Sequence, residues 1–230
     1  EVLESTPTIV TPTGVAGLTV EDEADAANRV VESTKTKGNA ADSPDTWVLV
    51  IHEGGFQSGT AVLNGCAGNL AGSAIADIAS RLDPRVKVIV SAHTHAEYRC
   101  TITAGGVTRL ITSASSFGRI LSDITLTIDD KTGELVSASA ENTIVENATT
   151  APPAARVPDP AKEDPQVAAV RDQYVTASAP LANLVIGRIQ GDLTRTDSAG
   201  RGETTLGDVI ADAQFVATQP APLGGAQLAF

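Results

Sequence analysis

The chain has 230 residues, a formal net charge of −12 and 42% apolar residues, few of them aromatic. These apolar residues suffice for a core of Val, Ile, Leu and Ala, and no apolar run is long enough to span a membrane. The acidic charge and the absence of clustered Lys and Arg exclude a typical nucleic-acid partner, because such binding depends on basic contacts to phosphates. The chain lacks methionine and begins with Glu1, so we expect it to be an excerpt or a processed piece.

Helices and strands are predicted to alternate in the N-terminal half. A short strand is predicted around Ile9, and a helix over 22–37, where alanines and valines recur at helical spacing. The continuous apolar run 47–51 predicts a strand that is buried on both faces. A helix with one apolar face then covers 75–82, and a second buried strand covers 86–90. This order is the one expected of an α/β domain.

The pattern changes to antiparallel strands in the next segment. Residues 98–104 and 107–114 flank Gly105-Gly106, a pair that favours a two-residue hairpin turn. Residues 122–129 alternate strictly between polar and apolar side chains, and the alternation resumes over 134–145. We therefore predict an antiparallel meander with one face exposed to solvent.

The C-terminal third begins with a proline-rich segment. Residues 150–165 contain five prolines and predict a linker. A helix is expected over 165–179, with proline in its first turn, then a strand over 184–189 and a helix over 206–216. The final residues 227–230 have the composition of a further strand. This last block is too short to form a domain by itself.

All three histidines of the chain follow predicted buried strands. His52 comes directly after 47–51, while His93 and His95 follow 86–90 after two small residues. Ligands in open α/β sheets bind at the carboxyl ends of strands, and neutral imidazole is the commonest ligand for catalytic transition metals. If the two strands are neighbours, the three rings can converge on a metal. The alternative is that each histidine is an ordinary surface or core residue.

The two cysteines allow two interpretations. Cys66 and Cys100 could join His93 and His95 in a structural zinc site, but the paired ligand spacing typical of such sites is missing. A Cys66–Cys100 disulfide is the preferred prediction, and it implies an oxidising compartment. It would close a loop of about 35 residues and tether the chain just beyond His95.

Several segments resemble one known family in the same order along the chain. The segment 91–95 reads SAHTH and resembles the Gly-His-Thr-His signature of the 5′-nucleotidase family of calcineurin-like metallophosphoesterases. The segment 52–55, HEGG, resembles that family's earlier His-x-Gly-Gly. Residues 111–128 are similar to the stretch after the signature, with its Gly-Arg turn. Residues 186–187 and 202–213 look like the opening of the C-terminal nucleotide-binding domain.

The resemblance implies two divalent metal ions, zinc, manganese or similar, that share a bridging water. His52 and His93 would ligate one ion and His95 the other. Arg201 is the candidate for the arginine that grips the phosphate, and Arg195 is a weaker candidate. The family's remaining ligands and its catalytic acid would lie before residue 1, so no catalytic residue is identifiable in this piece.

One position departs from the signature. Ala92 replaces a glycine, which would be costly if the backbone there had a positive φ or approached a neighbour closely. The segment that completes nucleotide binding would lie beyond Phe230.

The expected fold is α/β, a partial calcineurin-like β-sandwich flanked by helices, with the start of an α+β C-terminal domain. The expected boundaries are 1–149 for the second half of the metallophosphoesterase domain, 150–182 for a linker with a helix, and 183–230 for the beginning of the C-terminal domain.

The predicted function is that of an extracytoplasmic, metal-dependent nucleotide phosphohydrolase, with a nucleotide or related phosphate ester as substrate. The alternatives are a 2′,3′-cyclic-nucleotide phosphodiesterase with 3′-nucleotidase activity, which uses the same ligands, and a non-catalytic surface binding protein on the same scaffold.

Overall fold

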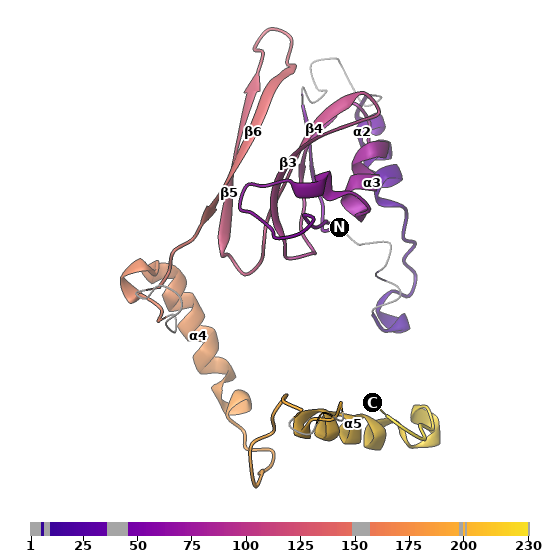
Figure 1. Ribbon diagram of the computed structural model, residues 1–230, viewed down its shortest axis with the longest axis vertical. Coiled ribbons are helices and arrows are strands. Elements are labelled where there is room, and N and C mark those ends of the chain that lie inside the picture. The colour runs from indigo at the N-terminus through magenta and orange to yellow at the C-terminus, as the bar shows by residue number, and fades with distance from the viewer. Residues whose placement is uncertain are drawn as a thin grey trace. The chain divides into compact units, whose positions relative to one another are not determined.

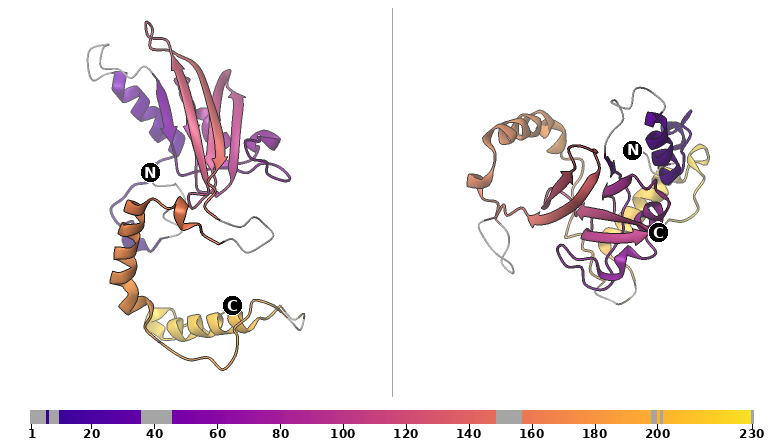
Figure 2. Two further views of the ribbon diagram at one scale, coloured as in Figure 1. Left: turned by 90° about the vertical axis from the view of Figure 1, so that its left-hand side faces the viewer. Right: turned by 90° about the horizontal axis from the view of Figure 1, so that it is seen from above.

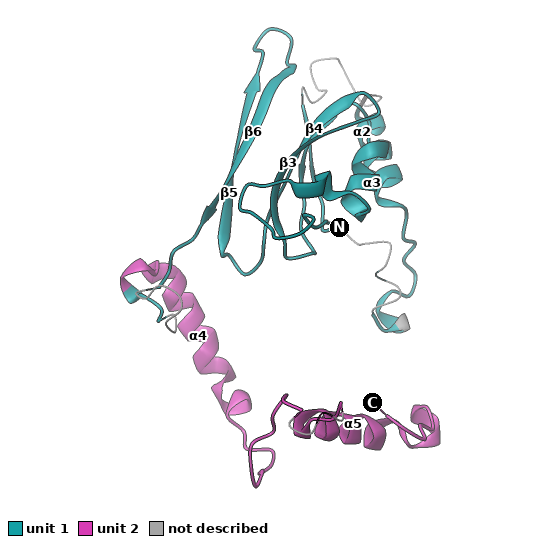
Figure 3. Ribbon diagram, viewed as in Figure 1, with its two compact units in different colours: residues 1–160 teal, residues 161–230 magenta. Residues whose placement is uncertain are grey.

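The computed structural model divides into two compact units, residues 1–160 and 161–230, which are described separately (Figure 3). It describes residues 6, 10–35, 46–148, 157–197, 200 and 202–229. The strand predicted around Ile9 lies outside these residues. None of the described helices has the length and apolar character that a membrane span needs.

The first unit is built around a four-stranded mixed sheet with the order β1-β2-β4-β3 (Figure 1). Its strands are β1 (Trp47–Val50), β2 (Val86–Val90), β3 (Glu97–Ala104) and β4 (Val107–Ala114). Strands β1, β2 and β4 run parallel, whereas β3 pairs antiparallel with β4 through the predicted Gly105-Gly106 turn. Both turn glycines have a positive φ, the conformation that such two-residue turns require. The α/β alternation and the hairpin are thereby confirmed.

Two helices cover one face of this sheet: α2 (Glu23–Lys35) and α3 (Ala74–Arg81). The apolar face of α3 is buried through Ile75, Ile78 and Ala79, and it packs with Ile89 and Ile111 of the sheet. Two short 3₁₀ helices, Pro12–Gly14 and Ala67–Leu70, lie in the connections of this unit. The main core of the unit therefore lies between the helices and the sheet.

The opposite face of the sheet is covered by a separate two-stranded sheet (Figures 1 and 2). Strand β5 (Ile120–Ile128) pairs antiparallel with β6 (Leu135–Ile144). Val88 and Leu110 point away from the helices and pack against Ala140 of β6. The unit thus has three layers: helices, mixed sheet and hairpin. The predicted meander exists as two paired strands that stack on the sheet instead of extending it.

A buried amide fastens the hairpin to the sheet. Asn142 of β6 is almost fully buried, and its Nδ2 donates to the carbonyl oxygens of Tyr98, at 3.1 Å, and of Ser113, at 3.0 Å. A buried polar side chain is stable only when its hydrogen bonds are satisfied, so this residue fixes the hairpin in one register.

One prediction about β1 is wrong. The apolar run 47–51 indicated burial on both faces, but Val48 and Val50 are 40% and 70% exposed. Strand β1 lies at the edge of the sheet, and only its Trp47 and Leu49 face packs against the core under the helices. The β5–β6 hairpin packs over β3 and β4 and leaves the other face of β1 uncovered by described residues.

The second unit contains two helices, α4 (Pro165–Ala182) and α5 (Thr205–Thr218), and a 3₁₀ turn at Ala221–Leu223. A further 3₁₀ turn at Pro160–Lys162 precedes them. Asp164 caps α4 by accepting hydrogen bonds from the backbone of its first turn, and Thr204 caps α5 in the same way.

Two strand predictions in this unit are wrong. Residues 184–189 and the described residues 227–229 are irregular. No described residue of this unit belongs to a strand, so neither segment has a strand to pair with. An apolar run of this kind becomes a strand only beside another strand.

Candidate metal centre

Two histidines lie at the carboxyl ends of adjacent parallel strands. Val50 pairs with Val90, and the next backbone amide, that of Ile51, still donates to the Val90 oxygen at 2.9 Å. The chains therefore leave β1 and β2 at the same edge. The rings of His52 and His93 meet there edge to face, with centroids 5.1 Å apart, and both residues are exposed.

The loops that carry these histidines are packed together through a glycine. The amide of Ala92 donates to the Glu53 oxygen at 3.1 Å, and Thr94 Oγ1 donates to the Gly55 oxygen at 3.0 Å. A Cβ atom on Gly54 would clash with the Ala92 carbonyl oxygen and lie 2.7 Å from Thr94 Oγ1. The close approach of the two strand-end loops thus requires glycine at position 54.

The backbone is strained beside these loops. His93 has φ 70° and His95 φ 56°, and the neighbouring Ser115 and Phe117 each have φ 59°. This left-handed region is unfavourable for residues with a Cβ, and such conformations cluster at functional sites. Ala92 does not share the positive φ, so the residue that replaces the signature glycine is unstrained. The close backbone approach between the two loops occurs instead at Gly54, which lies against the Ala92 carbonyl oxygen.

A buried tyrosine holds the carboxyl end of β2 in place through a hydrogen bond. Tyr98 is fully buried, and its hydroxyl lies 2.6 Å from Ser91 Oγ, which also donates to the Thr112 oxygen at 3.0 Å. Burial raises the pKa of Tyr98, and the hydrogen bond with Ser91 partly opposes this shift. The phenol therefore stays neutral and holds Ser91, two residues before His93, against the sheet.

His95 lies in a different setting from the other two histidines. Its ring packs edge to face on Phe117, with centroids 5.4 Å apart, and its carbonyl oxygen accepts a hydrogen bond from Ser115 Oγ at 3.1 Å. The guanidinium carbon of Arg119 lies 5.0 Å from the centre of the Phe117 ring. Sequence reasoning assigned no role to Phe117 or Arg119. The only signal for them was the Gly-Arg turn after β4.

The described residues fit part of a metal site. His52 and His93 are close enough for their imidazoles to serve one ion together. Among the described His, Cys, Asp and Glu residues, however, no group of three could hold an ion. A catalytic transition-metal site needs at least three protein ligands, so this pair requires additional donors.

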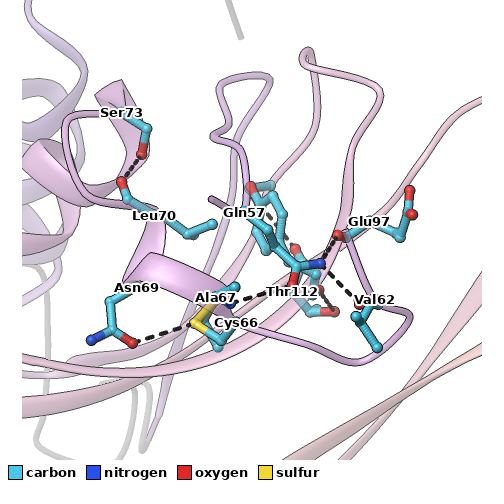
Figure 4. Close-up of a disulfide and its surroundings, with 12 residues drawn as sticks. Gln57, Val62, Cys66, Ala67, Asn69, Leu70, Ser73, Glu97 and Thr112 are labelled. Carbon is cyan, nitrogen blue, oxygen red and sulfur yellow. Dashed lines mark hydrogen bonds between the residues drawn. A yellow bond between two sulfur atoms is a disulfide. The ribbon is translucent and has the colours of Figure 1, made fainter. Parts of the chain in front are cut away.

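The predicted disulfide is confirmed (Figure 4). Cys66 and Cys100 are bonded, with Cα atoms 5.0 Å apart, which joins the loop after the His52 segment to β3. Gln57 fixes the same loop, since its Nε2 donates to the carbonyl oxygens of Val62 and Glu97, each at 2.9 Å. Bonded cysteines cannot act as thiolate ligands, so the alternative of a structural zinc site that includes them is wrong.

The two arginines predicted to bind phosphate both belong to the second unit. Arg195 is exposed in the second unit. Arg201 lies outside the described residues.

These features define a mixed α/β protein with imidazoles at the carboxyl ends of neighbouring parallel strands, the usual position of ligand sites in such sheets. The sequence matches no protein-family model. The chain is distantly related to the endonuclease YhcR of Bacillus subtilis (strain 168), with 27% identity over 211 residues. The match covers 92% of this chain but only 15% of YhcR.

This chain also matches part of the solved structure of the calcineurin-like phosphoesterase YfkN from Bacillus subtilis. It has 20% sequence identity and a TM-score of 0.42, and the match covers 62% of this chain and 42% of that chain.

Proposed function

We propose that this chain contributes to a metal-dependent phosphoesterase of the 5′-nucleotidase kind. The observation that carries the proposal is the contact between the His52 and His93 rings at adjacent strand ends, 5.1 Å apart and open to solvent. The strained backbone at His93 and His95 and the glycine contact beneath the loops support it, because both features hold imidazoles in fixed positions.

Within this proposal, His52 and His93 hold one divalent ion and His95 contributes to a second. A bound metal pair supplies an acidified water as nucleophile and neutralises charge on the phosphoryl oxygens. The residues of this chain keep the imidazoles in place. Tyr98 and Ser91 hold the end of β2, and Gly54 keeps the loop with His52 against the loop with His93.

The donors missing from the His52–His93 pair come, in this proposal, from other residues of the native protein. The 230 residues by themselves should therefore bind metal weakly and show no turnover. The Cys66–Cys100 disulfide favours an oxidising compartment, and we accordingly place the protein outside the cytoplasm.

Phosphodiester hydrolysis is the second candidate activity, because the distant relative YhcR is named as an endonuclease. The net charge of −12 opposes a polynucleotide substrate, so a small cyclic or linear diester is the better form of this candidate. The remaining alternative is a non-catalytic binding protein on the same scaffold. We disfavour it because such a protein would not need two histidines with a strained backbone at the edge of the sheet.

The deciding experiment compares the native full-length protein with its His52→Ala and His93→Ala variants. Phosphate release from nucleoside monophosphates and hydrolysis of cyclic nucleotides are measured with excess Mn²⁺ or Zn²⁺, beside direct titration of metal binding. We expect each variant to lose about a hundredfold or more in turnover and to bind metal more weakly. Lys131→Ala, in the exposed β5–β6 turn, is the control. Equal turnover and metal affinity in wild type and His93→Ala would disprove the proposal.

A further inference from the structure

Arg119 differs from the other described arginines of the first unit because its guanidinium has no carboxylate or carbonyl partner among the described residues. Four of the others form ion pairs with Asp or Glu, and a fifth is buried and donates to backbone carbonyl oxygens. The four are Arg29, Arg81, Arg85 and Arg99, and the fifth is Arg109. Arg119 is exposed, and within the described part of the chain it forms no ion pair. An unpaired guanidinium is unexpected in a chain with a net charge of −12.

The backbone around Arg119 is fixed, whereas its guanidinium is open to solvent. The Arg119 amide donates to the Ser116 oxygen at 3.2 Å, and its carbonyl oxygen accepts from the Val145 amide at 2.8 Å. Its guanidinium stacks on Phe117, which is 80% exposed and has a positive φ. A large aromatic side chain held in the open at a backbone cost is better explained by a ligand than by the core.

Phe117 contacts both Arg119 and the candidate metal ligand His95. Its ring lies against the His95 ring and also under the guanidinium. The guanidinium carbon and the His95 ring centre therefore lie 5.0 Å and 5.4 Å from the centre of the same aromatic ring. A phosphoryl group held at His95 would leave the Arg119 donors free for a neighbouring anionic group of the same molecule.

A cavity of about 420 Å³ opens at this position and is lined by Ser115, Phe117, Arg119 and Asn147, among others. This volume is within the range of small-molecule sites. Glu97 also lines the cavity, but it forms no ion pair with Arg119. The guanidinium is thus available to an incoming anion.

We propose that Arg119, stacked on Phe117, binds a second phosphate of the substrate, next to the one that is hydrolysed. This inference rests on the proposed function and narrows its substrate class to esters with two adjacent phosphates, such as nucleoside diphosphates. Arg119 is then a specificity residue, because its planar donors hold an anionic group that a monophosphate lacks.

The test uses the native full-length protein, its Arg119→Gln variant and the control Arg29→Gln. The control removes the same charge from an exposed ion pair on α2. The steady-state parameters are measured for a nucleoside diphosphate and for the monophosphate of the same base, and binding of pyrophosphate and of inorganic phosphate is titrated directly. Arg119→Gln should raise KM for the diphosphate and weaken pyrophosphate binding by about tenfold each, because it removes a charge-assisted contact. Its effects on the monophosphate and on inorganic phosphate should stay within about twofold.

Arg119→Lys should recover only part of the diphosphate affinity, because it keeps the charge without the planar fork. Equal effects of Arg119→Gln on both substrates, or pyrophosphate affinity equal to that of wild type, would overturn the inference while leaving the proposed function intact. A wild-type protein without phosphoesterase activity, in which Arg119→Gln still weakens pyrophosphate binding, would refute the proposed function and support the anion site.

Discussion

The contact between the two strand-end loops can be tested by adding one methyl group. Gly54→Ala places a Cβ against the Ala92 carbonyl oxygen and 2.7 Å from Thr94 Oγ1. Backbone and a short side chain cannot both move away without separating the loops. The hydrogen bonds from the Ala92 amide to Glu53 and from Thr94 to Gly55 would then be weakened or lost.

The size of the effect follows from these contacts. Overpacking a tight site costs about 1–3 kcal/mol, and each hydrogen bond contributes about 0.5–1.5 kcal/mol. With both hydrogen bonds lost, we therefore expect Gly54→Ala to lower the free energy of unfolding of the first unit by about 2–6 kcal/mol. It should also weaken metal binding, because separation of the loops moves the His52 ring away from the His93 ring.

Urea unfolding of the first unit can be followed by the fluorescence of Trp47, the single tryptophan of the chain, which lies half-buried in β1. The midpoint for Gly54→Ala should fall by about 1–3 M, for an m-value of about 2 kcal/mol per M of urea. Gly14→Ala is the matched control, because its new Cβ meets only Thr11 Oγ1 at 3.4 Å, an ordinary contact. If Gly54→Ala unfolds at the same urea concentration as Gly14→Ala and binds zinc like wild type, the loops are not packed in the way described.

Three further predictions concern the first unit. Replacing Cys66 and Cys100 together by alanine should cost about 3–4 kcal/mol in urea unfolding, since the bond closes a loop with a sequence separation of 34; an unchanged midpoint would contradict this. Hydrogen bonds from Arg81 lower the pKa of Asp22 from 3.8 to about 2 in the folded protein. The stability that these bonds give the fold is therefore complete above pH 3.8 and is lost as the pH falls through 2. The stability gap between wild type and Asp22→Asn, measured at about pH 6 and about pH 2.5, should therefore narrow in acid. Tyr98→Phe should lower the free energy of unfolding by about 1 kcal/mol, measured in the same way, because the buried hydroxyl loses its bond with Ser91.

The strand-end position of the histidines could be predicted because local sequence encodes it. The apolar runs 47–51 and 86–90 are each bounded by turn residues, and a helix lies between them. A strand–helix–strand connection places parallel strands side by side, so His52, His93 and His95 were expected to converge at one edge. The His52 and His93 rings meet there, whereas the His95 ring packs on Phe117. The disulfide was also predictable, since the chain contains only two cysteines.

Other features depend on tertiary neighbours and leave no local pattern. The exposed stack of Phe117 and Arg119 has no periodicity, and its meaning appears only when His95 is beside it. The run 184–189 has the composition of a strand, but among the described residues of the second unit it meets no strand to pair with. Likewise, the apolar character of β1 did not reveal that one of its faces is open.

The Cys66–Cys100 bond has a further consequence for the resistance of the protein to proteolysis. The bond makes residues 66–100 a covalent ring that contains His93 and His95. If a protease cleaves one peptide bond in an exposed turn of this ring, the two resulting pieces of the chain stay covalently joined by the disulfide. The cleaved chain keeps both histidines covalently attached to β3, so a single cleavage need not release this part of the molecule.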